Sequence, residues 1–79
     1  MVIGMLEKGI SEALEGETKF EMEDAHAWYF LISNGEIEME VKIVREDGVL
    51  WKRESGAEDW DFTFLTKEDL MPVEHSIVN

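Results

Sequence analysis

The sequence contains no cysteine, and its 79 residues include a single proline. Without cysteine, neither a disulfide framework nor a thiolate zinc site can form. A chain of this length must then be held together by a hydrophobic core, near the lower end of the size range in which a core suffices. The lack of cysteine also fits a reducing compartment, where disulfides are rare.

Basic residues are also scarce: seven Lys and Arg stand against nineteen Asp and Glu, so the formal net charge is −12. A small domain needs a net charge of only about 2–8 in magnitude for solubility. Excess charge of one sign destabilises the compact state by self-repulsion. The composition therefore indicates that something other than folding favours the negative charge. A chain this acidic repels both nucleic acid and anionic membranes.

Long hydrophobic runs are missing. No stretch approaches the roughly 20 apolar residues that are needed to span a bilayer, and the first residues lack the basic region of a secretion signal. We therefore expect one soluble, cytoplasmic domain over residues 1–79.

The patterns typical of enzymes are missing as well. The four serines have no nucleophile-elbow context, and the six glycines form neither a dinucleotide-binding nor a P-loop pattern. Paired catalytic carboxylates need an apolar cleft, for which a chain this short leaves little material. The acidic stretches do not continue into an EF-hand pattern, and His26 and His75 have no metal-ligand spacing. We expect no enzyme, no catalytic residues, no metal site and no cofactor.

Hydrophobic periodicity predicts a helix over residues 2–14, because Ile3, Leu6 and Ile10 recur at three- and four-residue spacing. Ala13 extends this stripe, and Gly16 is a plausible end of the helix. From residue 19 the period changes to two, which is typical of strands. The pattern indicates strands at residues 19–23, 25–32, 36–43, 49–53 and 59–64.

Turn residues organise these strands. Asn34-Gly35 predicts a hairpin with a type I′ turn, and Asp47-Gly48 predicts a second tight turn. Residues 66–69 resemble a capping box that opens one helical turn, and residues 73–78 form either an edge strand or a loose tail. Short connections favour sequential pairing. The predicted fold class is α+β, with an N-terminal helix packed on a four- to five-stranded antiparallel meander sheet.

The eight aromatic residues supply most of the predicted core. Single-strand nucleic-acid binders stack bases on aromatics, but they combine them with a basic groove that an acidic chain lacks. We therefore expect core packing. Trp51, next to Lys52 and Arg53, is the exception and is a candidate anchor for a protein partner.

Carboxylates alternate along the predicted strands. Glu36, Glu38 and Glu40 lie at two-residue steps, about 6.6–6.8 Å apart in a strand. If the acidic faces of several strands coincide, the sheet presents an array of negative charge that imitates a phosphate backbone. The alternative is an ordinary polar face turned to water. The candidate partner-binding residues are Glu36, Glu38, Glu40, Asp59 and Asp61, followed by Glu21 and Glu23.

In size, charge and strand-borne carboxylates, the chain resembles small acidic inhibitors such as phage anti-restriction and anti-CRISPR proteins and other DNA mimics, although no sequence motif is shared. This resemblance implies a protein that occupies the basic, nucleic-acid-binding surface of a partner protein and makes no direct contact with nucleic acid. One alternative is an immunity protein or antitoxin that neutralises a basic nuclease toxin. Another is a small homo-oligomeric structural or assembly subunit, and the sequence leaves the oligomeric state open.

Overall fold

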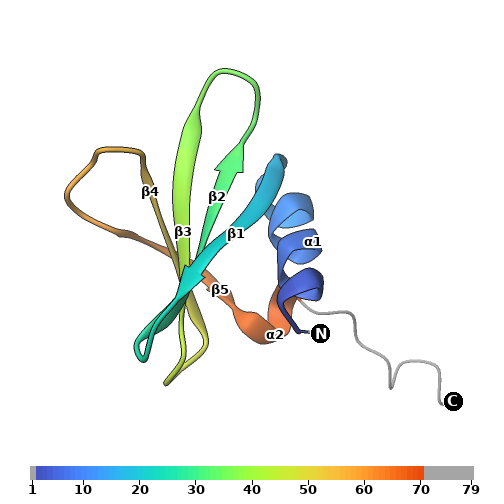
Figure 1. The fold of residues 1–79 in the computed structure, drawn as a ribbon, viewed down its shortest axis with the longest axis vertical. Helices are drawn as coiled ribbons and strands as arrows, with labels where there is room; N and C mark the ends of the chain where they lie inside the picture. Colours follow the sequence, from blue (N-terminus) through green and yellow to red (C-terminus); the bar gives the residue numbers. More distant parts are fainter. Residues whose placement is uncertain (1, 71–79) are drawn as a thin grey trace, which may run out of the picture.

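The computed structural model describes residues 2–70, in which a helix is followed by five strands and a short second helix (Figure 1). The strands pair antiparallel in sequence order, so the expected α+β class, with a helix and an antiparallel meander, is confirmed with five strands. The strand or tail expected at residues 73–78 lies outside the described part of the chain. The elements are α1 (Val2–Leu14), β1 (Glu17–Glu23), β2 (Ala27–Ser33), β3 (Glu38–Val44), β4 (Val49–Glu54), β5 (Asp61–Thr66) and α2 (Lys67–Leu70).

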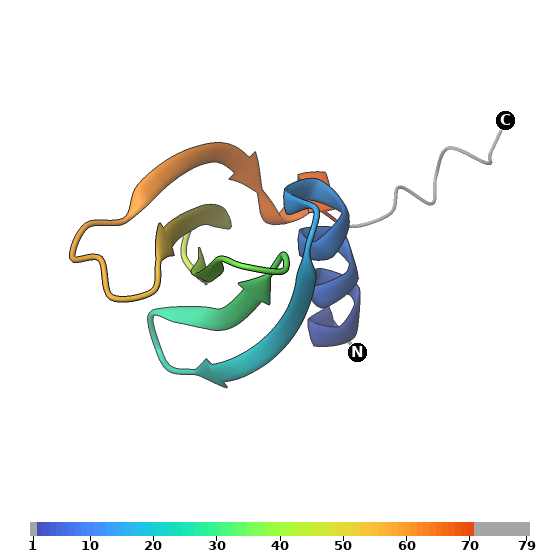
Figure 2. The same ribbon diagram turned by 90° about the horizontal axis from the view of Figure 1, so that it is seen from above.

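The sheet is strongly curved, and both of its edge strands approach the helices (Figure 2). The helix α1 packs against β1 and α2, and α2 follows β5 directly. The two helices therefore cover one face of the sheet, which we call the helix face. We call the opposite face the outer face; within residues 2–70 no helix covers it.

The core lies between α1 and the helix face. Directly paired residues on neighbouring strands point to the same side of a sheet. Phe30 pairs with Val41, and Ile43 pairs with Leu50, so these apolar side chains converge under α1. The predicted alternation along β3 is confirmed by the burial of its apolar residues. The buried cluster comprises Leu6, Ile10, Phe30, Ile32, Val41, Ile43, Leu50 and Leu70.

The helix α1 has the bounds that the periodicity predicts. Its buried residues include Gly9, where an added Cβ would fall on the carbonyl oxygen of Leu70 and lie 2.8 Å from the Leu70 Cβ. Glycine at this position therefore allows α1 and α2 to pack closely. Ala13, expected in the buried stripe, is exposed.

The helix ends through a left-handed residue, as helices commonly do. That residue is Glu15, with φ at 58°, and the N–H of Gly16 donates to the carbonyl of Ser11 at 3.1 Å. The expected stop at Gly16 is thus displaced by one residue. Gly16 itself packs tightly, because an added Cβ would lie 2.8 Å from Cγ1 of Ile32.

The hairpin between β2 and β3 forms as expected, but the type I′ prediction for Asn34-Gly35 is wrong. The N–H of Asn34 donates to the carbonyl of Ile37 at 3.2 Å, so the two central residues are Gly35 and Glu36. Of these two residues, only Gly35 has positive φ (104°), which is the pattern of a type II′ turn. As a consequence β3 begins at Glu38, and the first carboxylate of the predicted ladder lies in the turn.

Candidate binding surface

The connections divide the molecule into two ends (Figure 1). The β2–β3 turn and the β4–β5 loop lie at one end, and the β1–β2 and β3–β4 turns lie at the other. Because β3 and β5 both begin at the first end, five of the seven predicted binding residues gather there. We call this region the acidic end. It comprises Glu36, Glu38, Glu40, Glu54, Glu58, Asp59 and Asp61.

The β3 carboxylates differ in their surroundings. Glu36 and Glu38 are exposed, and the carbonyl of Glu38 accepts the N–H of Ser55 at 3.1 Å, which ties the β4–β5 loop to the start of β3. Glu40 is half-buried, and its Oε1 lies 2.8 Å from Nε of Arg53. Glu36 and Glu38 therefore present their charge to water, whereas Glu40 is neutralised by its neighbour on β4.

Asp59 and Asp61 approach the acidic end from the other side. Asp59 is exposed in the β4–β5 loop, and Asp61 is exposed at the start of β5. Asp61 pairs with Lys52, which in turn pairs with the buried Val41. Asp61 therefore lies on the helix-face side, whereas the β3 carboxylates lie on the outer face. The carboxylates surround the end of the sheet and do not form the two-dimensional array on one face that was considered from the sequence.

Two members of the acidic end were not among the predicted residues. Glu54, opposite Met39, ends β4, and the carbonyl of Glu58 accepts a hydrogen bond from Nη1 of Arg53 at 3.3 Å. Both side chains are exposed. A signal for them is present in the sequence, because they flank the Ser55-Gly56 turn that begins the acidic β4–β5 loop.

The remaining two predicted residues lie on β1, outside the acidic end. Glu21 is the extra residue in a β-bulge between Phe20 and Met22. Glu23 is 3.6 Å from Nη1 of Arg45. Glu23 thus lies at the end of the sheet opposite the acidic end, whereas Glu21 lies nearer the middle of β1 and is separated from Glu40 by the intervening strand β2.

Basic side chains near the acidic end pack on an aromatic ring. Lys42 Nζ lies 4.6 Å, and the Arg53 guanidinium carbon 4.2 Å, from the ring centre of Trp60. Such cation–π contacts contribute about 0.5–1 kcal/mol at exposed sites. These contacts hold Trp60 and the β4–β5 loop against the outer face, and they hold both cations there as well.

A second tryptophan, Trp28, is covered in the same way by Arg45 and Lys67, at 4.6 and 5.4 Å from its ring centre. Four of the seven basic side chains are therefore held over tryptophan rings. Two ion pairs form within residues 2–70, both from arginines of this group: Arg45 with Glu23, and Arg53 with Glu40 at the acidic end. The acidic end keeps a negative net charge, because its seven carboxylates outnumber the three cations beside it, Lys42, Lys52 and Arg53.

The outer face is more aromatic than the sequence suggested. One row of directly paired residues crosses all five strands, and it contains a cation and three aromatic rings. The expectation that the aromatics pack in the core is wrong for Phe62 and Phe64, whose exposed fractions are 47% and 81%. The row comprises Met22, Tyr29, Lys42, Trp51 and Phe62.

A bulge in β5 explains the exposure of Phe64. Residues 63–65 lie opposite Leu50 alone, and Phe64 has φ at 68°. The Thr63 hydroxyl donates to the Leu50 carbonyl at 2.7 Å and accepts the N–H of Leu65 at 3.1 Å, so it bridges the interrupted ladder. Leu65 packs against the core, and Phe64 projects outward. A left-handed conformation costs a residue with a Cβ roughly 1–2 kcal/mol.

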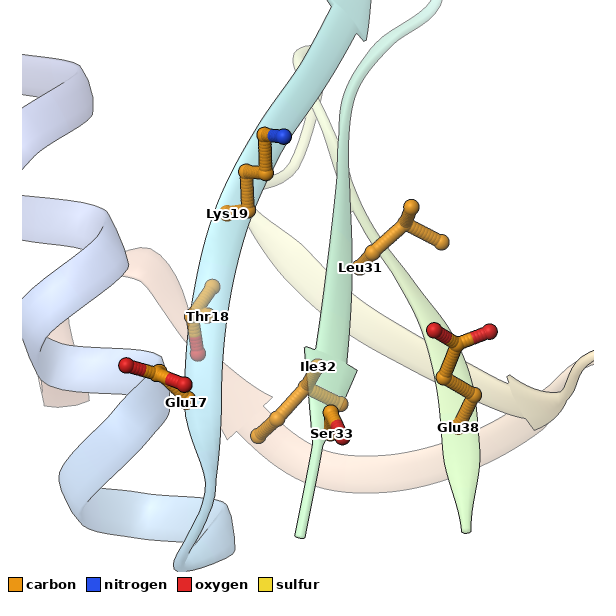
Figure 3. Close-up of a pocket in the computed structure, with 7 residues that line it drawn as sticks. All are labelled: Glu17, Thr18, Lys19, Leu31, Ile32, Ser33 and Glu38. Carbon is orange, nitrogen blue, oxygen red and sulfur yellow. The ribbon is translucent and has the colours of Figure 1, made fainter. Parts of the chain in front are cut away.

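An open groove of about 460 Å³ runs over β1, β2 and β3 near the acidic end. Lys19 and Glu38 lie on opposite sides of Leu31 along it (Figure 3). Glu17 also lines the groove, so charges of both signs lie along it and carboxylates predominate. No group of three or more potential metal ligands occurs among the residues that the structure describes.

Shifted pKa values occur at the end opposite the acidic end. The pKa of Asp24 is lowered, chiefly because its carboxylate accepts the N–H of Ala27 and also that of His26, each at 2.9 Å. Burial raises the pKa of Tyr29, and the nearby negative charge of Asp24 adds to the effect. Both shifts follow from closure of the β1–β2 turn, which also makes β2 begin at Ala27 instead of the expected residue 25.

No protein-family model, curated protein or solved structure matches this chain. Over the described residues, neither helix has the length and apolar character needed to cross a membrane. Fold and surface together define a small acidic α+β protein with a carboxylate-rich end and an exposed aromatic cluster on an edge strand.

Proposed function

We propose that this protein is a stoichiometric inhibitor that binds the basic, nucleic-acid-binding surface of a partner protein. The acidic end is the observation that carries the proposal, because five chain segments bring seven carboxylates together there, and one of these forms an ion pair within the described residues. A basic site built for phosphates would accept such a cluster, since DNA also presents closely spaced negative charges, one per roughly 1.7 Å of axis.

The overall charge supports the same function. Opposite charges steer two proteins together and raise the association rate in a salt-dependent manner. A net charge of −12 gives this protein a strong field toward any basic partner. Inhibition then requires no chemistry, because the bound protein excludes nucleic acid from the site. We place this activity in the cytoplasm, a reducing compartment that the lack of cysteine fits.

Affinity capture tests the proposal. The tagged protein is incubated with extract of the cells that carry its gene, and bound proteins are eluted with a salt gradient or with duplex DNA. The proposal predicts that a basic nucleic-acid-binding protein is retained, elutes as salt rises and is displaced by DNA. Retention that is insensitive to both salt and DNA, or no specific retention, would overturn it.

A further inference from the structure

The outer face of β4 and β5 carries three aromatic rings in contact, which we call the aromatic cluster: Trp51 on β4, and Phe62 and Phe64 on β5. The ring centres of Trp51 and Phe62 are 5.3 Å apart, and those of Phe62 and Phe64 are 4.5 Å apart. The exposure of this apolar surface increases from β4 to the edge strand β5, where Phe64 is the most exposed large apolar residue among those described.

The requirements of folding alone do not explain why residue 64 is a phenylalanine. The bulge requires a left-handed residue at position 64, and glycine or asparagine meets that requirement at lower cost than a bulky aromatic. The neighbours on both sides already satisfy the fold, since Thr63 bridges the ladder and Leu65 packs on the core. The phenyl ring is held away from the core in a strained conformation, as is common at ligand-binding positions.

Carboxylates border the aromatic cluster along the chain in both directions. Asp59 and Asp61 precede it, and Glu68 and Asp69 follow it. At the far end of β5, the N–H of Lys67 donates to the Gly48 carbonyl at 2.7 Å, which places the acidic β3–β4 turn beside the strand end. A complementary surface is thus an apolar cleft with basic residues on both sides.

We propose that Phe62 and Phe64 insert into an apolar cleft of the same basic partner, while the carboxylates on either side contact its Lys and Arg residues. This inference rests on the proposed function and specifies the partner: its surface must combine positive charge with an apolar cleft. Buried aromatic anchors carry much of the affinity at protein interfaces, and the surrounding charges act mainly on the association rate. A second copy of this chain is a poor occupant, because each copy carries a charge of −12.

Two synthetic peptides of equal length and charge separate the apolar contribution to the binding affinity from the electrostatic contribution. One is an amphipathic helical peptide with lysine and leucine faces, and the other has serine in place of each leucine. Calorimetric titration compares the full-length wild type with Phe64→Gly, which removes the ring and suits the left-handed backbone. Met5→Ala, which truncates an exposed apolar side chain on α1, is the matched control.

The wild type should bind the leucine peptide about tenfold more tightly than the serine peptide, as burial of one large apolar side chain implies. Phe64→Gly should lose this preference, bind the serine peptide as before and melt at an equal or higher temperature. Met5→Ala should match the wild type.

Three outcomes would overturn the inference. If wild type binds both peptides equally, or if Phe64→Gly keeps the preference, the cluster is no anchor, although binding of the serine peptide would leave the proposed function standing. If neither peptide binds, the proposed function fails as well. If sedimentation velocity shows a wild-type dimer and a Phe64→Gly monomer, the cluster is a contact between copies of this chain.

Discussion

Within the described residues, two residues other than glycine adopt a left-handed backbone: Glu15, with φ at 58°, and Phe64, with φ at 68°. Their contexts differ. Glu15 ends α1 because the next residue, Gly16, must pack against Ile32 with no room for a side chain. Phe64 has no such neighbour, and its ring is exposed. At the residue scale, the left-handed conformation of Glu15 therefore follows from the packing of its neighbour, whereas we infer that the conformation of Phe64 serves binding.

The lowered pKa of Asp24 makes the stability of the folded protein depend on pH. Folding lowers its pKa, so its contribution is complete above the ordinary value of 3.8 and is lost as the pH falls through the lowered folded value. Asp24→Asn removes the charge and keeps an oxygen that can accept the same N–H groups. We expect the wild type to be more stable than Asp24→Asn at neutral pH, and this difference to shrink below pH 3.8, as measured by urea unfolding across the range. A difference independent of pH would contradict this origin.

At the element scale, α1 and α2 pack closely through a single glycine. Gly9→Ala should lower the free energy of unfolding by about 1–3 kcal/mol, because the new methyl group would overlap Leu70. Gly4 is the matched control in the same helix, since an added Cβ there meets no atom within 4 Å. Gly4→Ala should raise stability by about 0.5–1 kcal/mol through helix propensity. Equal effects of the two substitutions in urea denaturation would argue against the α1–α2 contact.

The β5 bulge depends on the hydroxyl of Thr63. Thr63→Val keeps the shape of the side chain but leaves the Leu50 carbonyl and the Leu65 N–H without their partner. We expect a loss of stability of about 1–3 kcal/mol, the cost of unsatisfied buried polar groups. Amide hydrogen exchange should accelerate in β5 more than in β2. Unchanged exchange in β5 would show that the bulge is held by other contacts.

The elements that the sequence predicted well are those whose pattern depends on burial alone. The stripe of α1 and the alternation of β3 follow from contact with one core, and the observed bounds and buried faces agree with them. The predictions failed where local hydrogen bonds determine the conformation of the backbone. Asn34 donates to Ile37 and shifts the turn by one residue, and Thr63 stabilises a bulge that turns Phe64 outward. Hydrophobic periodicity gives no signal for either of these hydrogen bonds.

At the scale of the whole molecule, the sequence predicted the amount of negative charge but not its distribution. Five of the seven candidate residues gather at one end because β3 and β5 both start there, whereas Glu21 and Glu23 lie apart from them on β1. The order of the strands determines where the carboxylates lie, and the amino-acid composition carries no information about that order. Nor could the sequence show that tryptophan rings hold four cations, or that, within the described residues, one carboxylate of the acidic end forms an ion pair.

Two matched variants distinguish the effect of where the negative charge lies from the effect of the total negative charge on binding. The first reverses three exposed residues of the acidic end, Glu36→Lys, Glu38→Lys and Asp59→Lys, and leaves the Glu40–Arg53 pair intact. The second reverses three exposed residues that lie neither at the acidic end nor among the carboxylates beside the aromatic cluster, Glu12→Lys, Glu21→Lys and Glu23→Lys. Each reversal adds two charges, so both variants carry −6 instead of −12.

The most direct measurement is the affinity of the captured, purified partner for the wild type and these two variants at equal salt. We expect a large loss, on the order of a hundredfold, for the first variant, because several carboxylate–cation contacts are lost together. The second variant should lose less than about tenfold, since it alters only long-range steering. Equal losses in the two variants would contradict the account, because binding would then depend on total charge and not on the acidic end.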